Sequence, residues 1–302
     1  MKQLQKIQSV FKGIQQYLYR SILFTAVICL TTFTWAQESS LPNALLWKIS
    51  GDQLSSSSYI FGTIHLKDKS VFQFSDSVLP RLEACEVYAP EMDLAPEKIA
   101  PLYSKLLLPG DSTLTDIFTP DEYRMIGDVL KKKTGMDISF FNKMRPIALM
   151  MLAMNSQLPD EEKFTLDEFL YQKAIAQHKT IEGIETPEEQ LNLLGEITKE
   201  DILDYFRHPG QKEDMEKMVV LYRQGKLDSL LTEMQNDTLN IDFQKNFITT
   251  RNYRMAFRID TLIQRHTAFI AIGAGHLPGK EGVIGLLEKK GYRVKPVFVI
   301  SF

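Results

Sequence analysis

The sequence predicts a mixed α/β fold made of two β/α halves that carry matching motifs, with a sheet flanked by helices. Residues 59–65 read Tyr-Ile-Phe-Gly-Thr-Ile-His, and residues 267–276 form a second apolar run that ends in Gly-Ala-Gly-His. Each stretch is a strand that runs into Gly-x-x-His. Between them, from about residue 96 to 265, charged residues and helix-start signals dominate. We therefore expect a mostly helical insertion that acts as a lid or second lobe.

The first 36 residues are typical of a secretory signal peptide. Residues 1–20 carry four basic residues and no acid, and an apolar run of about fifteen residues follows from Ser21 to Trp35. Small residues then precede a cleavage point near Ala36. The run is shorter than the ~20 residues that span a bilayer. We predict an exported protein, periplasmic or secreted; an uncleaved segment that anchors the chain to the membrane is the alternative.

The charge and the cysteine content argue against nucleic-acid binding and against a fold stabilised by an internal disulfide. The whole chain has a net charge of −3, and removal of the basic segment 1–36 leaves 31 basic against 38 acidic residues. An acidic chain lacks the electrostatic footprint of a nucleic-acid-binding protein. Cys85 is the one cysteine of the mature chain, so stability depends on an ordinary core, and we expect residues 37–300 to form a single domain.

The strands of the first half follow from alternation and turn residues. Residues 45–50 and 59–63 alternate around a serine-rich turn, which predicts an antiparallel hairpin that delivers His65 at its end. Residues 71–84 have a helical pattern. The apolar run at 86–90 predicts a buried parallel strand.

The insertion and the second half follow from capping signals and helical periodicity. Thr119-Pro120 and Thr186-Pro187 each place a capping residue before proline and acids, which marks a helix start. The methionines of residues 144–158 fit a helix that fills the core. We expect helices over 99–108, from 119, over 144–158, 165–177, from 186, in pieces over 197–238, over 241–264 and over 282–290, and strands over 180–184, 267–272 and 292–300.

Two histidines and two acids stand directly after apolar strands. His65 and His276 follow Gly-x-x, and Glu91 and Glu185 end the runs at 86–90 and 180–184. Taken singly, each histidine can be an ordinary residue at the edge of a sheet, and each acid a helix cap. Together they form a plausible site for a divalent transition metal, which supplies a nucleophilic water at neutral pH. No His-Glu-x-x-His helix, Gly-x-Ser-x-Gly elbow or complete phosphate loop is present.

Four stretches together resemble the TraB/GumN family. They are Leu46–Ile49 with Phe61–Leu66, the segment Gly183–Leu191, the pair Arg251-Asn252, and the segment from Gly273 to Val294. The likeness covers about residues 42–300, with the motifs in the family's order. This family is similar to the Tiki proteases, which depend on a divalent metal and remove residues from the N-terminus of Wnt proteins. A more distant likeness reaches erythromycin esterases and a haem-binding family.

The resemblance implies essential roles for His65, His276 and Glu91, with Mn, Co or Zn as the cofactor. Our first hypothesis is an exported metal-dependent hydrolase, a peptidase that acts on a peptide or on another small substrate. Glu91 would be a ligand or the general base, and Glu185 is a second candidate for either role. Arg251, Asn252 and Gln190 would bind the substrate or support the site residues. The alternative is a non-enzymatic protein of the same fold that sequesters a peptide or haem.

Overall fold

The computed structural model describes residues 41–73, 76–156, 159–195, 197–209, 212–236 and 245–298. The signal-peptide segment with its cleavage point near Ala36 lies outside the described residues. The strands are β1 Leu46–Ser50, β2 Ser58–Thr63, β3 Val87–Pro90, β4 Thr180–Ile181, β5 Ala268–Gly273 and β6 Arg293–Pro296. The longer helices are α2 Val78–Ala84, α3 Pro96–Lys105, α5 Pro120–Thr134, α6 Pro146–Asn155, α7 Leu166–Ala176, α8 Pro187–Leu194, α9 Lys199–Arg207, α10 Lys212–Arg223, α11 Leu227–Asn236, α13 Arg251–Ile263 and α14 Val283–Lys289.

Six strands form one sheet in the order β4-β3-β5-β2-β1-β6. Strands β4, β3, β5 and β2 are mutually parallel, and β1 pairs antiparallel with β2 and with β6. The mixed α/β class predicted from the sequence is therefore confirmed, and so is the hairpin of β1 and β2. Because the four parallel strands share a direction, the segments that follow them leave the sheet at one edge.

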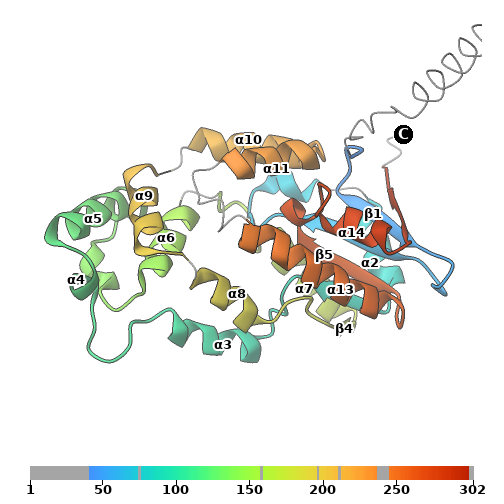
Figure 1. The fold of residues 1–302 in the computed structure, drawn as a ribbon, viewed down its shortest axis with the longest axis horizontal. Coiled ribbons are helices and arrows are strands. Elements are labelled where there is room, and N and C mark those ends of the chain that lie inside the picture. Colours follow the sequence, from blue (N-terminus) through green and yellow to red (C-terminus); the bar gives the residue numbers. More distant parts are fainter. Residues whose placement is uncertain are drawn as a thin grey trace, which may run out of the picture. The chain divides into compact units, whose positions relative to one another are not determined.

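The main core lies on the sheet. Strand β5 occupies a central position, and its residues Ala268–Ile272 are almost fully buried, as the apolar run predicts. Helix α2 packs on β2 and β5, α7 on β3, and α13 on β5 and α14 (Figure 1). These helices hold fixed the edge from which the candidate residues project.

A second hydrophobic cluster lies within the helical segment. Helix α5 packs against α6 and α9, and Ile126, Leu130 and Leu149 are fully buried between them (Figure 1). A capping box of Thr119 and Glu122 starts α5, as the sequence predicts. Helices α7 and α13 belong instead to the core on the sheet.

Three elements differ from the predicted boundaries. The helix expected over 71–84 contains a 3-10 turn, η1 Lys69–Phe72, and then α2. In its described part, the helix expected over 241–264 consists of a π-helical turn, η3 Lys245–Thr250, followed by α13. Within the described residues the last strand, β6, ends at Pro296, and the backbone N–H of Val297 still donates to the carbonyl of Leu46 over 2.8 Å.

Candidate functional site

The parallel strands bring the predicted acids to the same edge of the sheet as the two Gly-x-x-His motifs. Thr63 at the end of β2 pairs with Gly273 at the end of β5, so both motifs leave the sheet side by side. Glu91 follows β3, and its backbone N–H donates to the carbonyl of Ala271 over 2.7 Å. Met92 in turn bridges to Glu185, beyond β4. The four candidate segments are therefore neighbours across the sheet.

The Glu91 carboxylate is buried and partly occupied by hydrogen bonds. Its Oε1 accepts from Arg251 Nη2 at 2.5 Å and from Gln190 Nε2 at 3.1 Å. Its Oε2 accepts from the backbone N–H of Gly273 at 2.8 Å. Because each carboxylate oxygen has two lone pairs, Oε2 keeps one position for a further partner.

Positive and polar neighbours hold Glu91 in its charged form. Burial alone raises the pKa of Glu91, but the charges of His276 in its protonated form, of Arg251 and of His65 outweigh it and bring the pKa down to about 2. The site therefore contains a buried carboxylate that stays negative across the physiological range.

Glu185 points to arginine rather than to the histidines. Its side chain is fully buried, and Arg251 Nε lies 3.0 and 3.1 Å from its two oxygens, with Nη2 at 2.6 Å from Oε2. Gln190 Nε2 donates to the same Oε2 over 3.4 Å. Arg254 adds a longer contact of 3.5 Å. These contacts make Glu185 the anchor of the Arg251 guanidinium, which also holds Glu91.

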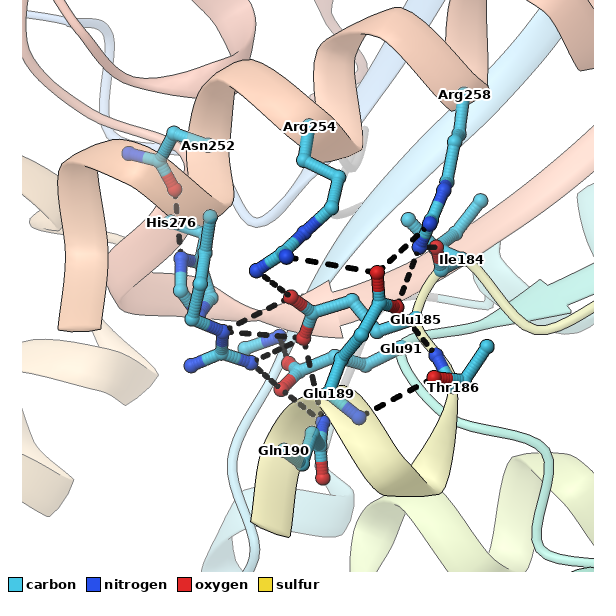
Figure 2. A network of polar contacts seen from close by, with 12 residues as sticks. Glu91, Ile184, Glu185, Thr186, Glu189, Gln190, Asn252, Arg254, Arg258 and His276 are labelled. Atoms are coloured by element: carbon cyan, nitrogen blue, oxygen red, sulfur yellow. Dashed lines mark hydrogen bonds and ion pairs between the residues drawn. The ribbon is translucent and has the colours of Figure 1, made fainter. Parts of the chain in front are cut away.

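One face of α13 carries a row of three arginines. Arg251, Arg254 and Arg258 are three and four residues apart, so they share a face of the helix. Arg258 forms two bonds of 2.7 and 2.8 Å with the Glu189 carboxylate, and Arg254 lies 3.4 Å from it (Figure 2). Sequence reasoning singled out only the first arginine. The signal for Arg254 and Arg258 was their spacing of three and four residues, which places them on the same helix face as Arg251.

His276 is held through one ring nitrogen. It closes the 3-10 turn η4 Ala274–His276 and is 4% exposed. Its Nδ1 lies 2.6 Å from Asn252 Oδ1, while Asn252 Nδ2 donates to the carbonyl of Glu281 over 2.8 Å (Figure 2). The second bond fixes the amide with its oxygen toward the ring. Since an amide oxygen only accepts, Nδ1 carries the proton and Nε2 keeps a free lone pair.

Burial keeps the His276 ring neutral. Desolvation, more than any neighbouring charge, lowers the pKa of His276 to about 4. A neutral imidazole with a free Nε2 is the form that binds a metal ion or accepts a proton.

The two motif glycines are required by close approach. A Cβ on Gly273 would lie 3.2 Å from Glu91 Oε2 and 3.5 Å from His276 Cδ2, the ring carbon bonded to Nε2. A Cβ on Gly62 would lie 2.9 Å from Leu277 Cδ1 and 3.1 Å from the Ala274 backbone. Glycine therefore keeps the space over the end of β5 open between Glu91 Oε2 and the Nε2 edge of His276.

His65 is more exposed and has a partner that the sequence did not reveal. Its side chain is 66% exposed, and its Nδ1 lies 2.8 Å from Asp167 Oδ2 on α7. The charge of Asp167 raises the pKa of His65 to about 9. The other histidines, His178, His208 and His266, are exposed on the surface.

The donor types present fit a divalent transition metal. Two imidazoles and one carboxylate are ligands that such ions accept. Glu91 Oε2 and His276 Cδ2, the ring carbon beside Nε2, lie 3.2 and 3.5 Å from one point over Gly273, and burial strengthens any charge interaction there. Among the residues that the structure describes, no three His, Cys, Asp or Glu side chains already stand as a complete metal-binding group.

Comparison with known proteins identifies the family. The family model described as "TraB/PrgY/gumN family" matches residues 45–296. This chain belongs to the TraB/PrgY/gumN family. The matched region includes all seven residues that the sequence analysis selected.

Similar curated proteins carry the name metalloprotease. The chain is 26% identical to Metalloprotease TIKI1 of Danio rerio over 84% of this chain and 63% of that protein. It is 25% identical to Metalloprotease TIKI2 of Danio rerio, over 84% and 61%, and 27% identical to Metalloprotease TIKI1 of Homo sapiens, over 86% and 63%. This TraB/PrgY/gumN chain thus matches less than two thirds of the length of these relatives. No solved structure matches.

The described part of the chain offers no membrane-spanning helix. None of its helices combines the length and the apolar character needed to cross a bilayer.

Proposed function

We propose that this protein is an exported metal-dependent hydrolase that acts on peptides, with His65, Glu91 and His276 as its metal site. The observation that carries the proposal is that Glu91 Oε2 and the Nε2 edge of His276 flank the same space over Gly273, on the edge where His65 leaves the sheet. The similarity to proteins named metalloproteases supports the reaction class.

The bound metal would be Mn, Co or Zn, and it would acidify a water molecule and polarise the substrate carbonyl. His276 would contribute Nε2, since its Nδ1 is committed to Asn252. Glu91 would contribute Oε2, as a ligand or as the base that takes the water's proton. Burial of this carboxylate excludes bulk water from the proton transfer.

The charge network assigns different tasks to the two glutamates. Glu185 makes its closest contacts with Arg251 and is fully enclosed, so we assign it a supporting role rather than that of base or ligand. Arg251 is 4% exposed and Asn252 is 2% exposed. We therefore propose that Arg251 holds Glu91 and that Asn252 holds His276, rather than that either binds substrate. Gln190 would bridge the two glutamates.

Metal titration combined with peptide cleavage tests the proposal. Protein stripped with a chelator is titrated with Mn²⁺, Co²⁺ or Zn²⁺ by calorimetry, and a peptide library is then analysed for cleavage by mass spectrometry. We expect one metal per chain and metal-dependent cleavage, both lost in His276→Ala and Glu91→Gln. His266→Ala, which removes an exposed histidine 3.4 Å from Glu86, is the matched control and keeps both.

Two outcomes contradict the proposal. If the unmodified protein binds none of the three metals, the metal site is wrong. If it binds a peptide or haem with equal affinity before and after chelation, and cleaves nothing, the non-enzymatic alternative replaces the hydrolase.

A further inference from the structure

Asp167 has a buried carboxylate that faces the end of β2. It is the second residue of α7, and its side chain is only 11% exposed. Its Oδ1 accepts a hydrogen bond from Thr63 Oγ1 over 2.5 Å, and its Oδ2 lies 2.8 Å from His65 Nδ1. The backbone N–H of Leu166 donates to the carbonyl of Leu66 over 3.2 Å. The start of α7 is thus tied to the segment that carries His65.

Helix capping does not explain this carboxylate. Thr165 and Glu168 already form the capping box of α7, through bonds of 3.3 and 2.8 Å. An acid in the first turn gains from the helix dipole while it remains in water. Asp167 is instead enclosed, and its Oδ2 is shielded from solvent and accepts no hydrogen bond of good geometry in the described part of the chain. The His65 ring lies beside that oxygen, with Nδ1 2.8 Å from it.

The same arrangement recurs at the other Gly-x-x-His motif. His276 Nδ1 faces Asn252 Oδ1 from α13, and His65 Nδ1 faces Asp167 Oδ2 from α7. In each case an oxygen from a helix engages Nδ1 and leaves Nε2 as the second nitrogen. Histidines that bind metals are commonly fixed in this way through the nitrogen remote from the metal.

We propose that Asp167 is a positioning residue that holds His65 through Nδ1, so that Nε2 is the nitrogen presented to the metal and its water. This inference rests on the proposed function. The need for such a partner is greater at His65 than at His276, because the His65 ring is 66% exposed and packing alone does not fix it. The fixed ring would lose less freedom on binding the metal.

The first test uses the unmodified, metal-free protein. Long-range ¹⁵N–¹H correlation spectra report which ring nitrogen carries a proton, and the His65 signals are assigned by their absence in His65→Gln. We expect a downfield proton on Nδ1 that exchanges slowly with water. A His65 ring with its only proton on Nε2, or one that shows no hydrogen-bonded Nδ1 proton, overturns the inference.

The second test compares two aspartates in equivalent helix positions. Asp228 is the second residue of α11 and accepts from the backbone N–H of Leu41 over 2.7 Å, with no histidine beside it. We expect Asp167→Asn to weaken Co²⁺ binding, measured by calorimetry, by about 10- to 100-fold and to change the visible absorption of bound Co²⁺. Asp228→Asn should change neither.

The outcomes separate this inference from the proposed function. If Asp167→Asn binds Co²⁺ like the unmodified protein and keeps the same His65 spectrum, the positioning role is wrong and the metal site stands. If the unmodified protein binds no metal, the proposed function fails, and the metal-free His65 spectrum still decides whether Asp167 holds the ring.

Discussion

Removal of the Arg251 guanidinium should destabilise the protein strongly at neutral pH. In Arg251→Met the carboxylates of Glu91 and Glu185 remain in a site where they are 11% and 0% exposed, without their shared counter-charge. Loss of one partner from a buried pair typically costs about 3–5 kcal/mol, because the remaining charge is uncompensated.

The magnitude follows from the proton that the site must take up. The ordinary pKa of Glu91 is 4.5, which is about 2.5 units below pH 7, and each unit corresponds to about 1.36 kcal/mol. Neutralising this one carboxylate at pH 7 therefore costs about 3.4 kcal/mol. The same step costs less than about 1 kcal/mol at pH 5.

The sign of the pH dependence distinguishes the variant from the unmodified protein. In the unmodified protein the pKa of Glu91 is lowered, so its contribution to stability is complete above pH 4.5 and is lost as the pH falls toward 2. In Arg251→Met the folded-state pKa of Glu91 rises above the unfolded value. Folding then takes up a proton, and the difference between the two proteins shrinks as the pH falls from 7 to 5.

Urea unfolding followed by circular dichroism at pH 7 and pH 5, with chelator present, measures both effects. The matched control is Arg265→Met, which removes an exposed contact of 3.4 Å to Glu182 and should cost less than about 1 kcal/mol. The reasoning is refuted if Arg251→Met costs no more than this control at pH 7, or if its cost grows at pH 5.

Three further predictions concern the glycine, the outer arginine row and the N-terminus. Gly273→Ala places a methyl group 3.2 Å from Glu91 Oε2, and calorimetry should show metal affinity reduced by about tenfold or more with little loss of stability. Arg258 lowers the pKa of Glu189 to about 2, so Glu189→Gln should cost roughly 1–2 kcal/mol in urea unfolding at pH 7, and this cost should vanish as the pH falls from 4.5 toward 2. N-terminal sequencing after expression in an exporting host should find the mature chain starting just after Ala36; a retained segment there contradicts signal cleavage.

The sequence predicted the edge of the sheet well, because a strand gives a local signal. Apolar runs ending at His65, Glu91 and His276 implied strands, of which only the run at 86–90 was expected to be parallel. In the structure β2, β5 and β3 are parallel neighbours, and parallel strands collect their ends on one side. No spacing in the sequence could show that Glu91 and Glu185 have different contacts with Arg251. That difference depends on where the Arg251 side chain lies across gaps of 160 and 66 residues.

The sequence around Asp167 does not distinguish it from an ordinary first-turn acid, because the local pattern is complete without His65. Thr165, Asp167 and Glu168 form a good helix start in any helix. The Asp167 carboxylate is turned inward only by its tertiary contacts with Thr63 and His65. Thr63 is 104 residues away from Asp167 along the chain. Contacts of this kind carry no periodicity, so sequence patterns alone do not reveal them.

The position of Arg251 provides a counter-charge to Glu91 without covering the Oε2 atom of that carboxylate. A buried carboxylate beside a neutral His276 needs a counter-charge, but a cation on the oxygen that faces the histidine would occupy the position needed for a metal or a proton. Arg251 donates to Glu91 Oε1, and the Gly273 N–H uses only one position on Oε2. Glu185 keeps the guanidinium on that side through its own bonds. Glu91 thus remains charged, and in the described part of the chain its Oε2 keeps one position for a further partner.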